Sequence, residues 1–297
     1  MASGERVAGT GPARRAAVLG HPIEHSLSPA LHRAAYAALG LAGWRYDVVD
    51  LAEPDLPSFL GTLDPTWAGL SLTMPLKQAV LPLLDHVEPL AETVGAVNTV
   101  LVHAVGARAV LTGANTDVHG IVAALAEGGV GAPEAERPVL SAVVLGAGAT
   151  AASALAALGQ LGCTAPVVLA RSMARAGPTM RAAHRMGLDP TFRTLDADRA
   201  VALLVPADVV VSTLPPGAAD GVAEALRVAG ARAGGVLLDC AYHPRPTRLV
   251  TAWQTGGGVA VTGERMLLHQ AAEQVRLMTG RAAPVAAMDA ALSGALG

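Results

Sequence analysis

A short apolar run in the middle of the chain, Val143 to Leu145, leads directly into a turn of small residues and then into a long segment rich in alanine and leucine. Continuous apolar runs are typical of strands that are buried on both faces of a parallel sheet. A Gly-x-Gly turn after such a strand lets the backbone approach a diphosphate at the N-terminus of the next helix. A plain tight turn is the alternative, because the chain contains 33 glycines. The candidate cofactor-binding residues of this turn are Gly146, Ala147, Gly148, Ala149, Thr150 and Ala151.

The composition narrows the class of protein. The 297 residues suffice for two α/β domains, and 52% hydrophobic against 15% charged residues excludes global disorder. The formal net charge of −3 gives no electrostatic reason to expect nucleic acid or an acidic membrane surface as a partner. Residues 1–15 lack the apolar segment of a signal peptide, so we expect a disordered tail over residues 1–13 and a cytoplasmic protein.

Histidine and cysteine spacing indicates no metal site. Cys163 and Cys240 lie in apolar surroundings with no CxxC spacing, and no histidine pair has HxxxH or HExxH spacing. We therefore expect two unreactive thiols and no metal ion.

Strands and helices alternate along the first third of the chain, which implies a parallel sheet. We expect strands at residues 16–19, 44–49 and 67–72 and helices at 29–39 and 55–63. Ser28 is a favoured N-cap residue before Pro29, but two hydroxyls, Ser26 and Ser28, beside a helix N-terminus would also suit a carboxylate ligand. Lys77 follows the third strand, where open α/β sheets bind ligands, although a lone lysine there is also explained as a solvated charge.

The second half has the order of elements of a Rossmann-like domain. After a helix at residues 118–126 and a Gly/Pro/Glu-rich linker at 128–138, we expect five strands, at 139–145, 167–170, near Phe192, at 209–213 and at 236–239. Helices are expected at 150–161, at 175–186 and from Ala219. A last short strand at 259–261 is followed by helices from Gly263 to Met278 and from Pro284 to Leu296.

Six motifs in order along the chain resemble those of the shikimate dehydrogenase family. They are GHPIEHSLSPALH (20–32), LTMPLK (72–77), GAVNTV (95–100), NTDVHG (115–120), the glycine turn and GERMLLHQA (263–271). The resemblance covers nearly everything from Val18 to the C-terminus. It implies an oxidoreductase that reversibly reduces 3-dehydroshikimate to shikimate with NADPH, in the biosynthesis of chorismate and the aromatic amino acids.

The resemblance also implies roles for individual residues. Lys77 matches the family's general acid–base group and Asp117 its paired carboxylate, which also accepts a substrate hydroxyl. The residues that match substrate contacts are Ser26, Ser28, Thr73, Asn98, Asp117, Tyr242 and Gln270. Three positions depart from the family's pattern: Ser71 stands where many members carry Asn, His243 replaces the usual Asn after the tyrosine, and Arg248 replaces an apolar residue.

The residues after the second Rossmann strand favour NADP(H) over NAD(H). NAD-specific sites place an acidic residue about 20 residues beyond the glycine turn, but this chain has none between Glu136 and Asp189. Arg171, Ser172 and Arg175 occur there instead, and they suit a 2′-phosphate, although arginines at a helix start are also simply solvated. At the nicotinamide end we expect Ser212 and Thr213, and the resemblance adds Gly263 and Met266.

We expect a two-lobed α/β protein with the active site in the cleft between the lobes. The predicted substrate-binding domain is discontinuous, residues 14–117 with 264–297, and the predicted NADP-binding domain is residues 118–263. Two alternatives stay open: an enzyme with broader substrate or cofactor use that acts on quinate or with NAD, and a dinucleotide-binding paralogue without activity. The expected partner is a small molecule, and the protein is a monomer or a homodimer.

Overall fold

The computed structural model describes residues 13–106, 108–131 and 139–297. Most of the predicted tail and of the predicted 128–138 linker therefore lies outside the described residues. The contacts divide the chain into two compact units. The first contains residues up to Val87, residues 97–114 and residues 271–297, and the second contains residues 88–96 and 115–270.

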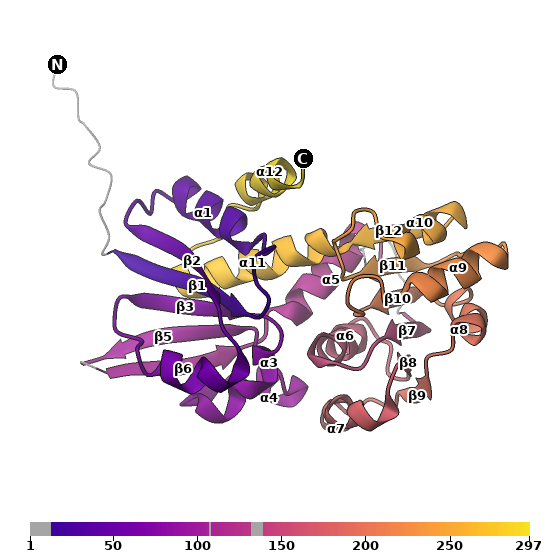
Figure 1. The fold of residues 1–297 in the computed structure, drawn as a ribbon, viewed down its shortest axis with the longest axis horizontal. Helices are drawn as coiled ribbons and strands as arrows, with labels where there is room; N and C mark the ends of the chain where they lie inside the picture. The colour runs from indigo at the N-terminus through magenta and orange to yellow at the C-terminus, as the bar shows by residue number, and fades with distance from the viewer. Residues whose placement is uncertain (1–12, 107, 132–138) are drawn as a thin grey trace, which may run out of the picture. The chain divides into compact units, whose positions relative to one another are not determined.

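A six-stranded mixed sheet forms the centre of the first unit (Figure 1). The expected parallel pairing is correct for the first three strands, because β1 pairs in parallel with both β2 and β3. It is wrong for β5, which is antiparallel to β3 and forms an antiparallel hairpin with β6 through Gly106. The order is β2-β1-β3-β5-β6-β4, with bounds β1 Arg14–Gly20, β2 Trp44–Asp50, β3 Trp67–Leu72, β4 His86–Val87, β5 Thr99–Val105 and β6 Arg108–Ala114.

Helices at both ends of the sequence contribute to the first unit. Helix α1, Ser28–Ala38, packs against α12, Val285–Leu296, although the two are more than 240 residues apart. The second half of α11, Gly263–Thr279, also lies in this unit, and its Met278 lies against β3 at Gly69. The shorter helices are η1 Glu53–Asp55, α2 Leu56–Leu60, α3 Leu76–Ala79 and η2 Leu81–Leu83.

The second unit has a six-stranded sheet in which every pairing is parallel, as predicted. The order is β12-β11-β10-β7-β8-β9, with bounds β7 Ala142–Leu145, β8 Val167–Ala170, β9 Thr191–Thr194, β10 Val209–Ser212, β11 Val236–Asp239 and β12 Val259–Thr262. After β7 the chain first adds β8 and β9 on one side of this strand, and later adds β10, β11 and β12 on its other side. Ligands of open α/β sheets bind at such a switch point, beyond the carboxyl ends of the strands.

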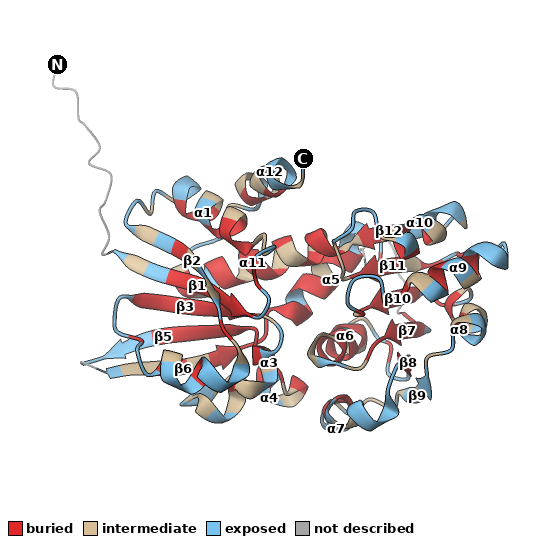
Figure 2. Ribbon diagram, in the orientation of Figure 1, coloured by how far each residue is buried: buried red, intermediate tan, exposed pale blue. Residues whose placement is uncertain are grey.

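Both faces of this sheet are covered, as the buried strands in Figure 2 illustrate. Successive residues of β7 point to opposite faces: Val144 belongs to one hydrophobic cluster, and Val143 and Leu145 belong to another. The first cluster contains residues of α5 Asp117–Glu127, α6 Ala149–Gln160 and α7 Gly177–Arg185, which cover one face. The second contains residues of α8 Ala197–Leu204, α9 Asp220–Val228 and α10 Arg248–Thr255, which cover the other face. The remaining elements of the unit are α4 Pro89–Val94 and η3 Met173–Arg175.

Candidate active site

The turn after β7 has a backbone that requires glycine at its first position. Gly146 has φ +109°, and a Cβ added to it would collide with the hydroxyl of Thr213. The turn is held by hydrogen bonds from the Gly146 N–H to the Leu169 carbonyl at 2.9 Å and from the Thr179 hydroxyl to the Ala147 carbonyl at 2.7 Å. The turn therefore has a fixed shape directly beyond the central strand.

Gly148 is the N-cap residue of the twelve-residue helix α6. A Cβ added to Gly148 would meet no atom within 4 Å, so there is open space over the helix N-terminus. Backbone N–H groups without helical acceptors point into that space and favour an anion there, and the first turn of α6 has no acidic residue. The residues of the turn thus fit the diphosphate of a dinucleotide.

The other candidate cofactor contacts follow neighbouring strands of the same sheet. Arg171 and Ser172 come directly after β8, Arg175 ends η3, and all three side chains are exposed. Ser212 ends β10 on the other side of β7, and the hydroxyl of Thr213 donates to the Leu145 carbonyl at 2.9 Å. Because parallel strands end at the same edge, these residues lie along one edge of the sheet. Two cationic side chains and a hydroxyl beside the turn fit a 2′-phosphate.

Five of the predicted substrate and catalytic residues belong to the first unit. Thr73 and Lys77 follow β3, and the Val97 N–H donates to the Lys77 carbonyl at 2.8 Å. The Leu72 N–H donates to the Asn98 carbonyl at 2.7 Å, so the segment before β5 is tied to the end of β3. The structure thus brings Thr73, Lys77 and Asn98 to one edge of the first sheet.

The two serines before α1 do not form the simple cap that local sequence suggests. Ser28 is the first residue of the helix, its N-cap residue is Leu27, and no side chain caps the helix. The Ser28 N–H donates to the Ser26 hydroxyl oxygen at 3.4 Å, and the buried Ser28 hydroxyl shares a hydrogen bond with Tyr46. The N-cap interpretation of Ser28 is therefore wrong, and its role as a carboxylate ligand stays a prediction.

Asp117 and Gln270 both belong to the second unit. Asp117 is the first residue of α5 and is buried, and the Thr116 hydroxyl before it donates to Gln270 Oε1 at 3.4 Å. One turn along α5, a Cβ added to Gly120 would lie 2.8 Å from the Met266 carbonyl oxygen and 2.9 Å from the Gln270 Cβ. The close approach of α5 and α11 at Gly120 thus brings Gln270 next to the start of α5.

Tyr242 and Gly263 follow β11 and β12 at the same edge of the second sheet. Tyr242 is partly buried, and this burial raises the pKa of its phenol above the usual range. A Cβ on Gly263 would collide with the Cys240 carbonyl, which explains why glycine opens α11. Met266, one turn later, is buried.

Two family models match the ends of this chain. The shikimate dehydrogenase substrate-binding domain matches residues 18–100, and the shikimate 5′-dehydrogenase C-terminal domain matches residues 263–292. A shikimate dehydrogenase (NADP(+)) of Moorella thermoacetica is 37% identical over 95% of this chain and 93% of its own length. The chain belongs to the shikimate dehydrogenase family.

Solved structures in this family share the fold of the chain. A shikimate 5-dehydrogenase of Thermus thermophilus, in complex with NADP(H) and shikimate, is 33% identical, covers 95% of this chain and 100% of its own, and has a TM-score of 0.77. A quinate dehydrogenase of Corynebacterium glutamicum, in complex with NAD, is 29% identical, covers 95% and 99%, and has a TM-score of 0.78. The two-domain α/β fold expected for the family is thus confirmed.

The three departures from the family's pattern differ in their surroundings. Arg248 is exposed and pairs with Asp220 at 3.6 Å. His243 is also exposed. Ser71 is buried and hydrogen-bonded to Tyr46 and Gln274, so this position belongs to a polar cluster inside the first unit.

The described part of the chain contains neither a cluster of metal-binding side chains nor a membrane-spanning helix. Within residues 13–106, 108–131 and 139–297, no three His, Cys, Asp or Glu side chains gather in a way that could hold a metal ion. No helix formed by those residues is long and apolar enough to cross a membrane.

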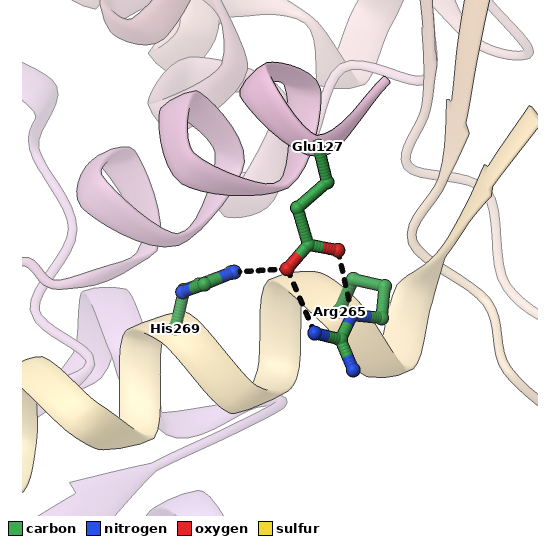
Figure 3. A network of polar contacts seen from close by, with 3 residues as sticks. All are labelled: Glu127, Arg265 and His269. Atoms are coloured by element: carbon green, nitrogen blue, oxygen red, sulfur yellow. Dashed lines mark hydrogen bonds and ion pairs between the residues drawn. The ribbon is translucent and has the colours of Figure 1, made fainter. Parts of the chain in front are cut away.

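A polar cluster that was not predicted from the sequence joins α5 to α11 (Figure 3). Glu127 at the end of α5 accepts two hydrogen bonds from Arg265, at 2.6 and 2.7 Å, and lies 2.7 Å from His269 Nε2. Arg265 and His269 are four residues apart, hence on one face of α11, and this spacing was the available signal. The cluster holds the helix that carries Met266 and Gln270 against the helix that starts at Asp117.

We expect the Glu127→Gln variant to lose about 1 kcal/mol or less of unfolding free energy at neutral pH. Hydrogen bonds from Arg265 hold the pKa of the Glu127 carboxyl below its usual range, with a smaller contribution from His269. A lowered pKa adds stability above the unfolded-state pKa, and this stability is lost as pH falls through the folded-state value. The difference between wild type and variant should therefore shrink in acid. Urea titrations across this pH range measure it, with Glu53→Gln as the control because Glu53 is an exposed residue at the start of the short helix η1. A difference independent of pH would contradict the assignment.

We expect Gly120→Ala to lose about 1–3 kcal/mol of unfolding free energy. The new Cβ would lie under 3.0 Å from the Met266 carbonyl oxygen, which is backbone, so α11 would have to shift. Gly294→Ala in α12 is the matched control, because a Cβ there meets no atom within 4 Å and should stabilise the helix by about 0.5–1 kcal/mol. Equal effects of the two substitutions on urea unfolding would show that the α5–α11 contact is not tight.

Proposed function

We propose that this chain catalyses the reversible NADPH-dependent reduction of 3-dehydroshikimate to shikimate. The observation that carries the proposal is its membership of the shikimate dehydrogenase family along 95% of its length, with an NADP(+)-dependent relative at 37% identity. The complete set of motif residues, Lys77, Asp117 and Gln270 among them, supports an active enzyme over a paralogue without activity.

Lys77 is the proposed general acid. Reduction of a ketone leaves an alkoxide that must receive a proton, and the reverse reaction needs the same group as a base. Lys77 is the only lysine in the chain, and the other 20 of its 21 lysine and arginine residues are arginines. An arginine cannot release a proton at neutral pH, whereas a lysine amine can. A chain that otherwise uses arginine almost exclusively thus has its one lysine at the position where proton transfer is required.

Asp117 is the proposed partner of Lys77 in the reaction, as the family resemblance implies. A carboxylate favours the charged form of a nearby amine and accepts a hydrogen bond from a substrate hydroxyl. Ser26 and Ser28 are the proposed ligands of the substrate carboxylate. The proposed ligands of its hydroxyls are Thr73, Asn98, Asp117, Tyr242 and Gln270.

NADP(H) is the proposed cofactor, and when bound it supplies or accepts the hydride. The turn and helix start from Gly146 to Ala151 would hold its diphosphate, and Arg171, Ser172 and Arg175 its 2′-phosphate. Ser212, Thr213, Gly263 and Met266 would lie at its nicotinamide end. The support for these assignments is the shape of the turn and the cationic residues after β8.

A quinate dehydrogenase that uses NAD is the second candidate, because the Corynebacterium glutamicum relative has that name and was solved with NAD. Arg171 and Arg175 after β8, without an acidic residue there, count against NAD in this chain. The predicted domain boundaries at residues 117/118 and 263/264, the cytoplasmic location and the choice between monomer and homodimer stay predictions.

The first experiment is an activity assay on the purified full chain. Addition of 3-dehydroshikimate to protein with NADPH should cause a loss of NADPH absorbance and the formation of shikimate, identified by chromatography. Tight NADPH binding without turnover of 3-dehydroshikimate or of quinate would favour the inactive paralogue instead.

A further inference from the structure

We propose that Gln274 and Thr99 are positioning residues that fix the direction of the Asn98 side-chain amide. The inference rests on the proposed function, because it takes Asn98 as a ligand of a substrate hydroxyl. The residues that carry it are all buried in the first unit: Tyr46, Ser71, Asn98, Thr99 and Gln274.

Gln274 uses every hydrogen-bonding position of its amide. Its Oε1 accepts from the Ser71 hydroxyl at 2.8 Å and lies 3.2 Å from His32 Nε2. Its Nε2 donates to the backbone carbonyl of Asn98 at 3.2 Å and to the Thr99 hydroxyl oxygen at 3.0 Å. A buried amide with both ends satisfied cannot turn over without leaving donors facing donors.

The hydroxyl groups around Gln274 determine which end of its side-chain amide faces Ser71. The Tyr46 hydroxyl donates to the Ser71 oxygen at 2.7 Å, so the single proton of Ser71 is directed to Gln274 Oε1. His32 stacks on the Tyr46 ring, and burial lowers its pKa to about 3, so it is neutral and adds no charge to the cluster. The acceptor end of Gln274 therefore faces Ser71 and the donor end faces Thr99.

Thr99 in turn orients the side-chain amide of Asn98. The Thr99 hydroxyl oxygen accepts a hydrogen bond from Gln274 Nε2. The single proton of this hydroxyl is therefore directed to Asn98 Oδ1, at 2.9 Å. With Oδ1 bound by Thr99, the end of the Asn98 amide that is directed away from Thr99 is Nδ2, a donor. The hydrogen bonds thus run one way, from Tyr46 through Ser71, Gln274 and Thr99 to Asn98.

This arrangement gives a specific role to a departure from the family's pattern. Ser71, where many family members carry Asn, places a hydroxyl within reach of Gln274 from α11. The two residues are 203 positions apart in the sequence. The direction of the Asn98 amide, directly before β5, therefore depends on a residue of α11.

The test compares Thr99→Val, which keeps the shape of the side chain but removes the hydroxyl, with Thr99→Ser, which keeps the hydroxyl. We expect Thr99→Val to raise both the KM and the calorimetric Kd for shikimate by about tenfold, with the KM for NADP⁺ changed less than about twofold. Thr99→Ser should restore both constants for shikimate to within about threefold of wild type. Gln274→Met, which removes the donor to Thr99, should change the shikimate constants in the same direction as Thr99→Val.

Val275→Ala is the control for a loss of stability alone. Val275 is fully buried on the same helix but makes no contact in this hydrogen-bond chain, so the variant should unfold at lower urea and bind shikimate normally. If Thr99→Val and Thr99→Ser were both active and had equal KM and Kd values for shikimate, this inference would be overturned and the proposed function would stand. The same rise in the shikimate constants in Val275→Ala would also overturn this inference. A wild-type protein that neither binds nor turns over shikimate would overturn the proposed function as well.

Discussion

Replacing Lys77 with alanine should lower kcat by about 10²–10⁴-fold, the usual contribution of a general acid–base group. The KM for shikimate should change by less than about threefold, because the proposed role of Lys77 is proton transfer and the proposed ligands of the substrate are other residues. Steady-state rates of shikimate oxidation with NADP⁺ measure both constants. A variant with near-native kcat would remove Lys77 from the proposed mechanism.

Lys77→Arg is the matched control for charge. Arginine keeps the positive charge but does not release a proton near neutral pH, so this variant should be impaired nearly as much as Lys77→Ala. A largely active Lys77→Arg variant would show that the cation matters rather than proton transfer. Because Lys77 is the only lysine, an amine reagent can modify only this side chain and the N-terminal amine. Reagent treatment should therefore abolish activity, with shikimate as a protecting ligand.

Removing both Arg171 and Arg175 should raise the KM for NADPH by about 10–100-fold while the KM for NADH changes by less than about twofold. The proposed ligand of these side chains is the 2′-phosphate, which NADH lacks. Both guanidinium groups are exposed after β8, and the chain has no acidic residue between Glu136 and Asp189.

Arg181→Ala is the control for this pair, since it removes an exposed arginine from the neighbouring helix α7. Its KM for NADPH should stay within about twofold of wild type. Equal losses for NADPH and NADH in the double variant would mean that the two arginines do not recognise the 2′-phosphate.

The second sheet was the part of the fold most open to prediction. Strands β8 and β11 have the predicted bounds, because each is a short apolar run that ends at a polar residue or a turn. Helix α8 was missed although its buried residues, Ala200 and Leu204, stand one turn apart; it is only eight residues long. Helix α10 was also missed; it follows a proline-rich segment and is only eight residues long.

The first sheet was predicted less completely. The β5–β6 hairpin was not expected, because the ends of both strands near Gly106 are exposed and the other ends adjoin motifs, with Thr99 in GAVNTV and Ala114 directly before NTDVHG. These residues were interpreted for their chemistry and not for their alternation. The parallel order of β1, β2 and β3 was correct because each pair is joined by a segment with a helical pattern.

The candidate residues could be chosen from the motifs, but their supporting contacts could not. The bond between Ser71 and Gln274 joins residues 203 positions apart, and that between Glu127 and Arg265 spans 138 positions. No local pattern indicates which distant side chain completes a buried hydroxyl or carboxylate. Such contacts follow from the packing of α11 against other elements, which only the three-dimensional structure provides.

The most direct measurement is a four-way comparison of kcat/KM for shikimate and quinate, each with NADP⁺ and NAD⁺. The account predicts that shikimate with NADP⁺ exceeds each of the other three combinations by at least about tenfold, the effect of roughly one charged hydrogen bond to the 2′-phosphate or of one substrate contact. A kcat/KM for quinate, or for NAD⁺, that equals or exceeds the value for shikimate with NADP⁺ would contradict it.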